Sequence, residues 1–190
     1  HFLERVIQLT AEMIAYWQSI GFVHGVMNTD NMSILGLTLD YGPYAFMDRY
    51  NPQQIFNHSD SDGRYTYANQ PNIAWWNLYR LAEALVTLHP DADQLEQVLA
   101  TYAEYYNQKY TQLMGAKLGL EAFTADDLPF LDELLQIMQV EKIDWTYFWR
   151  KLSYGSTGIS QLSCDYPSLA LGNWFAKLIA RYEGTKLTSQ

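Results

Sequence analysis

The sequence predicts a mainly α-helical fold with one small β ribbon. Apolar residues recur at helical spacing in several long segments. Gly, Pro, Asn, Asp and Ser are concentrated between those segments, which is typical of turns. Two short β-like runs, Ser33–Leu35 and Thr38–Asp40, are joined through Gly36 and are too short for an independent sheet. We therefore expect these runs to pair as a ribbon beside a loop at residues 23–31.

Helix boundaries are predicted from turn and capping residues. Gly21 is expected to end the first helix, and Pro71 suits the first turn of the second. Thr124 and Asp127 have the spacing of an N-terminal capping pair. The Gly/Ser-rich segment 153–163 is expected to be a connection. The predicted helices cover residues 2–20, about 71–88, 91–114, 125–139, 144–152 and 167–182.

Residues 43–71 are expected to form one long loop, because turn residues dominate them. The many aromatic residues of this segment favour an ordered, packed loop. Asp60–Gly63 has a weak similarity to a calcium-binding loop but lacks the further ligands and the closing Glu. We therefore interpret it as a turn. The remainder, residues 72–190, is expected to be helical.

Composition excludes several classes of partner. The chain has 190 residues, of which 48% are hydrophobic, so a packed core is expected. Its net charge of −9 argues against nucleic-acid binding and against an anionic membrane surface. No apolar run reaches the length of a membrane span. Cys164 is the single cysteine, so no internal disulfide can form.

Three polar residues lie in the otherwise apolar segment 23–42: Asp30, Asn31 and Asp40. Their oxygen atoms are suited to Mg²⁺ or Mn²⁺, and Mg²⁺ usually completes its coordination shell with waters and phosphates. A carboxylate that is free of the metal could accept a proton from a hydroxyl group. Asn and Asp are also common turn residues. From these residues alone, a metal–phosphate site and a purely structural turn both remain open.

The segment HGVMNTDNMSILGLTLDYGPY, followed by NHSDSDGRYTYANQPNIAWWNLYRLA, closely resembles the selenoprotein O family over residues 21 to about 85. The resemblance implies a protein-kinase-like fold, with residues 1–190 as its C-lobe. It also implies a protein adenylyltransferase, which moves AMP from ATP to Ser, Thr or Tyr hydroxyls of protein substrates. The implied cofactor is Mg²⁺ or Mn²⁺. The implied location is cytoplasmic for a bacterial member and mitochondrial for a eukaryotic one.

Residues 24–31 have the length of the kinase catalytic loop, which reads H-R-D-L-x-x-x-N. His24 opens this stretch and Asn31 closes it. Val26 occupies the position of the kinase base Asp and cannot accept a proton, which disfavours ordinary phosphoryl transfer. We expect the His24 ring to be structural, bonding backbone near the metal loop.

The resemblance also assigns roles to the polar trio. It implies Asp30 as the catalytic base and Asn31 as a metal ligand. Residues 40–42 read DYG where kinases have DFG, which implies Asp40 as the second metal ligand, close to the nucleotide phosphates. It further implies that ATP binds in an orientation reversed from that of kinases.

The resemblance leaves two other functions open, a kinase-type phosphotransferase and a non-catalytic nucleotide-binding or scaffold lobe.

The family's ATP pocket also uses an N-lobe with a Gly-rich loop and a Lys–Glu pair, and no such stretch precedes His1. We therefore expect residues 1–190 to be a fragment without its N-lobe. The fragment is expected to bind nucleotide weakly and to be inactive alone.

Overall fold

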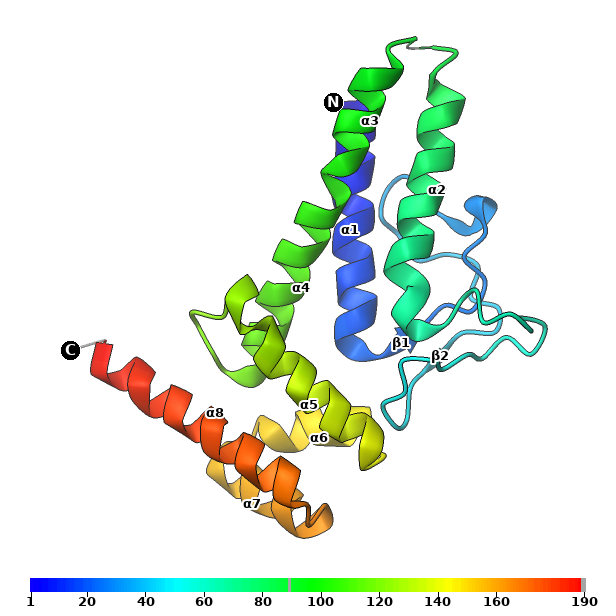
Figure 1. Cartoon of the computed structure of the whole chain (residues 1–190). Helices are drawn as coiled ribbons and strands as arrows, with labels where there is room; N and C mark the ends of the chain where they lie inside the picture. Colours follow the sequence, from blue (N-terminus) through cyan, green and yellow to red (C-terminus); the bar gives the residue numbers. More distant parts are fainter. Residues whose placement is uncertain (89, 189–190) are drawn as a thin grey trace. The chain divides into compact units, whose positions relative to one another are not determined.

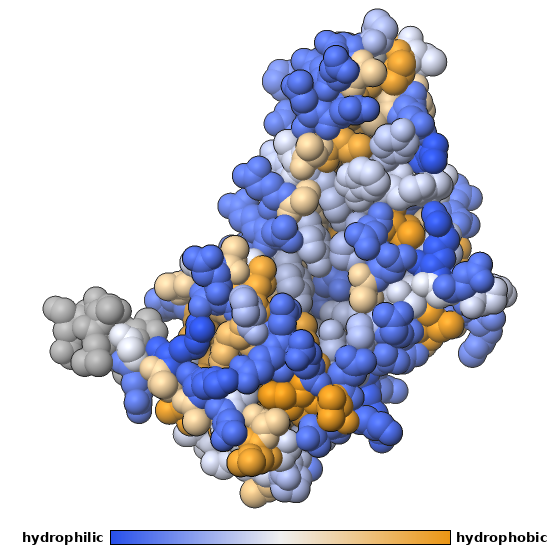
Figure 2. Space-filling view, in the orientation of Figure 1, coloured by the Kyte–Doolittle hydropathy of each residue, from blue (hydrophilic) through white to orange (hydrophobic). Residues whose placement is uncertain are grey.

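A computed structural model describes residues 1–88 and 90–188 and is mainly helical, as predicted (Figure 1). The chain divides into two compact units, residues 1–47 with 52–110 and residues 48–51 with 111–190. In the described part of the chain, no helix is both long and apolar enough to cross a membrane. Hydrophilic residues cover most of the face shown in Figure 2. The α-helices are α1 (Phe2–Ile20), α2 (Gln70–Leu85), α3 (Ala92–Ala100), α4 (Tyr102–Leu118), α5 (Leu128–Val140), α6 (Trp145–Leu152), α7 (Ser156–Asp165) and α8 (Leu169–Thr188).

In the first unit, α1, α2 and α3 pack side by side (Figure 1). The buried face of α1 includes Ile7, Ala11 and Ile14, which are fully buried. Their spacing of three to four residues is that of one helix face. Gly21 ends α1 in the left-handed conformation, with φ of 72°, as its sequence position predicted. This packing holds the start of the 23–31 loop against the core.

The small ribbon exists, but the predicted strands were wrong. β1 (Phe22–Val23) pairs antiparallel with β2 (Ala45–Phe46). Residues 33–36 instead form a turn, in which the Ser33 hydroxyl accepts from the Leu35 N–H and the Ser33 carbonyl accepts from the Gly36 N–H. Gly36 has φ of +65°, and a Cβ there would lie 2.8 Å from Leu9 Cβ. Local hydrogen bonding by Ser33 thus replaces strand pairing.

The segment 43–71 contains little regular structure, namely β2, the 3₁₀ helix η2 (Tyr67–Asn69) and the first turn of α2. The Asp60 carboxylate accepts hydrogen bonds from the N–H groups of Arg64 and Tyr65, both at 2.8 Å. Both carboxylate oxygens therefore close a turn of the backbone, which is the role that we predicted for this run.

The second unit packs α5 against α8 and α6 against α7. Phe130 on α5 stacks on Trp174 on α8 with ring centres 4.7 Å apart, and the Trp174 indole N–H donates to the Phe130 carbonyl. The predicted capping pair is confirmed, since Thr124 and Asp127 bond reciprocally at η3 (Ala125–Asp127) before α5. Asp144 likewise caps α6 through the Tyr147 N–H.

Two helix predictions in the later part of the chain were wrong. Residues 153–163 are not a connection, because 156–163 lie in α7. Gly158 permits this, since a Cβ there would lie only 1.7 Å from the Lys151 carbonyl oxygen. The predicted helix 91–114 is interrupted at Thr101, whose hydroxyl and N–H both donate to the Val98 carbonyl. A Ser or Thr side chain that bonds the backbone in this way competes with regular helix.

Candidate active site

Asp30 lies on the 3₁₀ turn η1 (Thr29–Asn31), where its side chain is exposed. The turn is closed by a hydrogen bond from the Asn31 N–H to the Asn28 carbonyl, 3.0 Å long. The Asn31 side-chain nitrogen donates to the Val26 carbonyl at 3.0 Å. This bond fixes the orientation of the carboxamide, so its oxygen is the atom that could meet a cation.

His24 links the backbone at Val26 to the backbone at Leu39, the residue before Asp40. Its side chain is fully buried, and its Nε2 lies 2.8 Å from the Leu39 carbonyl oxygen, one residue before Asp40. The Val26 N–H points at its Nδ1, 3.4 Å away. Nδ1 is therefore the acceptor and Nε2 carries the proton, which is the arrangement of a neutral imidazole. The ring therefore bonds backbone on both of its nitrogens, as expected of a structural residue.

Asp40 has a backbone conformation that is unusual for its residue type. Its φ is +57°, in the left-handed region, and its carbonyl accepts from the Gly42 N–H at 2.8 Å. Asp tolerates this region better than most residues, but strained positions cluster at functional sites. Its carboxylate is exposed. Tyr41, the next residue, is also exposed and lies edge-on to Tyr44, with ring centres 5.1 Å apart.

Carboxamide side chains from outside the segment hold the 22–31 backbone in place. Gln70 is fully buried at the start of α2, and it accepts from the His24 N–H while donating to the Phe22 carbonyl, both at 2.9 Å. Asn77 on α2 donates to the Met27 carbonyl at 2.9 Å, and Asn57 donates to the Gly25 carbonyl at 3.2 Å. Each bond satisfies a backbone group that would otherwise be costly to bury.

Sequence reasoning did not assign these carboxamides to the site. A signal was nevertheless present for two of them. Gln70 and Asn77 are seven residues apart, so they lie on one helix face, which they share with the buried Ile73 and Ala74. Polar residues on the buried face of a helix need hydrogen-bond partners, and a neighbouring loop can supply them.

The donor set fits a hydrated divalent cation and not a fully protein-coordinated one. Among the described residues, no group of three or more His, Cys, Asp and Glu side chains could hold a metal. The two predicted ligands, Asn31 and Asp40, offer a carboxamide oxygen and a carboxylate. Mg²⁺ commonly binds through one or two protein oxygens, with waters and phosphates completing the shell.

A sequence model of a protein family, described as "Protein adenylyltransferase SelO", matches residues 1–167. The chain belongs to the SelO family. The match includes the whole 22–42 segment, so His24, Asp30, Asn31 and Asp40 all lie within the part of the chain that defines SelO membership.

Bacterial relatives named "Protein nucleotidyltransferase YdiU" agree with SelO membership. The relative from Bordetella avium is 50% identical over 182 residues, 95% of this chain and 37% of its own length. The one from Pectobacterium carotovorum subsp. carotovorum is 54% identical over 174 residues, 90% of this chain and 36% of its own length. The chain therefore spans little more than a third of these relatives.

Proposed function

We propose that the full-length protein transfers AMP from ATP to hydroxyl groups of Ser, Thr or Tyr in protein substrates. One observation in particular supports this proposal. In a SelO-family chain, the Asn31 side chain bonds the Val26 carbonyl, and the buried His24 ring joins the Val26 N–H to the carbonyl of the residue before Asp40. The three polar residues are thus parts of one hydrogen-bonded segment and not separate surface turns.

In this proposal Asp30 is the general base. Its exposed carboxylate accepts the proton of the acceptor hydroxyl while the hydroxyl oxygen bonds to the α-phosphorus of ATP. The bond between that phosphorus and the bridging oxygen breaks, and pyrophosphate leaves. Asn31 and Asp40 would hold Mg²⁺ or Mn²⁺, which when bound neutralises charge on the phosphates. Both residues supply the oxygen donors that such cations prefer.

We further propose that residues 1–190 are the kinase-like C-lobe of the full-length protein, with 23–31 as the catalytic loop and 40–42 as the metal motif. Val26 favours AMP transfer over kinase-type phosphoryl transfer, because its side chain cannot act as the kinase base. Since the chain spans about 37% of the Bordetella avium relative, we expect the ATP site to need residues outside it. The 190 residues alone are then expected to bind MgATP weakly and to transfer nothing.

Mass spectrometry of protein acceptors tests the reaction type. Incubation of the full-length protein with ATP and a divalent cation is expected to add AMP to Ser, Thr or Tyr. Addition of a single phosphate instead would support the kinase alternative. ATP binding without any modification would support a non-catalytic nucleotide-binding lobe.

The metal pair gives a separate prediction. Asn31→Ala or Asp40→Ala in the full-length protein is expected to raise the Mg²⁺ or Mn²⁺ concentration for half-maximal transfer by about tenfold or more, because each removes an oxygen donor. Titration of activity against metal concentration measures this. Asn107→Ala, at an exposed position on α4, is the matched control. A metal requirement unchanged in both site variants would contradict the assignment.

A further inference from the structure

Two arginines share one tryptophan on the surface of the first unit. The guanidinium carbons of Arg64 and Arg80 each lie 4.8 Å from the centre of a Trp76 ring. Both cations therefore lie against the same tryptophan, although like charges repel. Arg80 also pairs with Glu83, but both side chains are almost half exposed. Such a pair contributes about 1 kcal/mol or less, so Arg80 can exchange Glu83 for another carboxylate.

The arginine pair is joined to the turn that carries Asp30. Arg64 is followed by Tyr65, whose hydroxyl donates to the Asn28 side-chain oxygen at 2.5 Å. Asn28 directly precedes the turn Thr29–Asn31. The Arg64 N–H is itself held by the Asp60 carboxylate. Hydrogen bonds on both sides of Arg64 thus fix its backbone relative to the turn.

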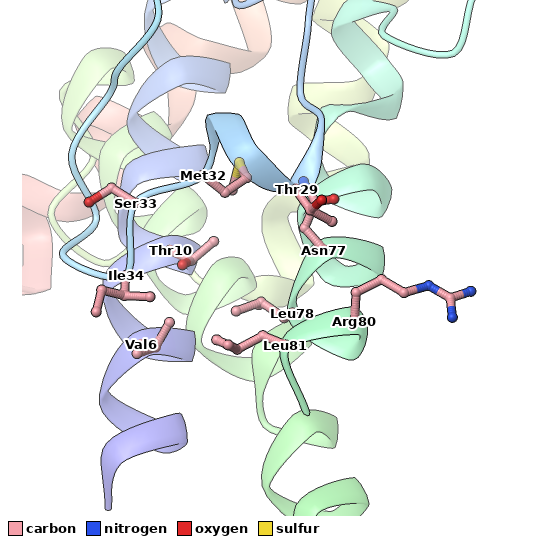
Figure 3. Close-up of a pocket in the computed structure, with 10 residues that line it drawn as sticks. All are labelled: Val6, Thr10, Thr29, Met32, Ser33, Ile34, Asn77, Leu78, Arg80 and Leu81. Atoms are coloured by element: carbon pink, nitrogen blue, oxygen red, sulfur yellow. The ribbon is translucent and has the colours of Figure 1, made fainter. Parts of the chain in front are cut away.

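A cavity of about 290 Å³ lies beside the same turn (Figure 3). Thr29 contributes to its wall, and so does Arg80, whose side chain extends outward from α2 in Figure 3. Much of the remaining wall is apolar and comes from α1, α2 and the residues after the turn. These apolar residues include Val6, Met32, Leu78 and Leu81.

Asn77 lines this cavity and has a buried hydrogen-bond acceptor without a partner in the described part of the chain. The side chain is 5% exposed, and its nitrogen donates to the Met27 carbonyl, which fixes the amide orientation. Its oxygen is buried and has no hydrogen-bond partner among the described residues. A buried acceptor without a donor costs about 1–3 kcal/mol.

The first unit is acidic overall, so the arginine pair is a local concentration of positive charge. Residues 1–47 and 52–110 contain four basic side chains, Arg5, Arg64, Arg80 and Lys109, against eleven acidic ones. Half of these basic side chains are stacked on Trp76. A paired cation on an otherwise acidic surface is complementary to a carboxylate-bearing partner.

We propose that this surface docks the protein substrate, through a segment in which an apolar residue is flanked by acidic residues. The apolar side chain fills the cavity, and the carboxylates meet Arg64 and Arg80. This inference rests on the proposed function. Thr29 is adjacent to Asp30, and an extended chain advances about 3.3 Å per residue. The target hydroxyl is therefore expected close to the apolar anchor along the substrate segment.

Synthetic peptides test the docking surface on the full-length protein. The probe contains one Ser, a nearby Leu and flanking Glu residues, and its matched form carries Lys in place of Glu. Arg64→Gln and Arg80→Gln are each expected to raise the KM of the Glu peptide about threefold, and together about tenfold, while the KM of ATP is unchanged. Arg5→Gln, an exposed basic position on α1, is the control.

Binding of fluorescent peptides, measured by anisotropy, keeps the test independent of catalysis. We expect the Glu peptide to bind more tightly than the Lys peptide and the double variant to lose that preference. Equal binding of the two peptides to the wild-type protein would overturn the inference, and so would a preference that survives in the double variant. An increase in the KM of ATP alone would assign the arginines to the nucleotide. Absence of AMP transfer with the binding preference retained would overturn only the proposed function.

Discussion

Replacing Asp30 by Asn in the full-length protein is expected to lower the rate of AMP transfer by about 10²–10⁴-fold, the usual contribution of a general base. The carboxamide is nearly the same size as the carboxylate but cannot accept the proton of the acceptor hydroxyl. Because Asp30 is exposed on the turn η1, the free energy of unfolding is expected to change by less than about 0.5 kcal/mol. The initial rate of transfer to a protein acceptor measures the effect.

Asp62→Asn is the matched control for that experiment. Asp62 is also exposed, on the neighbouring 43–71 loop, and the proposal gives it no role in the reaction. Its variant is expected to retain full activity. Equal rates for wild type and Asp30→Asn would show that another group takes the proton.

The second large effect is expected from Gln70→Ala. This change leaves the His24 N–H and the Phe22 carbonyl without their partner in a fully buried position. Each unsatisfied buried group costs about 1–3 kcal/mol, so the variant is expected to lose about 2–6 kcal/mol of unfolding free energy. Urea denaturation followed by tryptophan fluorescence measures the loss.

Gln97→Ala, at an exposed position on α3, serves as the control and is expected to change stability by less than about 0.5 kcal/mol. Gln70→Ala should also reduce AMP transfer, because Gln70 positions the loop that leads to Asp30. A urea midpoint equal to that of the wild type would refute the proposed function of this carboxamide.

Helix boundaries could be predicted from the sequence because local chemistry sets them. Gly21 ends α1, Pro71 lies in the first turn of α2, and Asp144 caps α6. Each of these effects depends on residues within one turn of the boundary. The α7 helix could not be predicted in this way. Gly158 looks like a helix breaker in sequence, and only the close approach of the Lys151 carbonyl explains it.

The candidate site was only partly predictable for the same reason. The spacing of His24 and Asn31 and the chemistry of Asp30 and Asp40 could be analysed along the chain. The pairing of Val23 with Ala45 could not be predicted, because these residues are 22 positions apart. The segment between them contains a turn that the Ser33 side chain stabilises. The carboxamides that hold the loop and the left-handed φ of Asp40 also follow from tertiary packing. Whether Asn31 and Asp40 bind metal stays a prediction.

The most direct test of the central claim compares ATP labelled at the α-phosphate with ATP labelled at the γ-phosphate. Wild-type full-length protein and its Asp30→Asn variant are each given both substrates with a protein acceptor. We predict that the wild type transfers the α label and not the γ label, and that the variant transfers the α label about 10²–10⁴-fold more slowly. Transfer of the γ label by the wild type, or of the α label by the variant at the wild-type rate, would contradict the account.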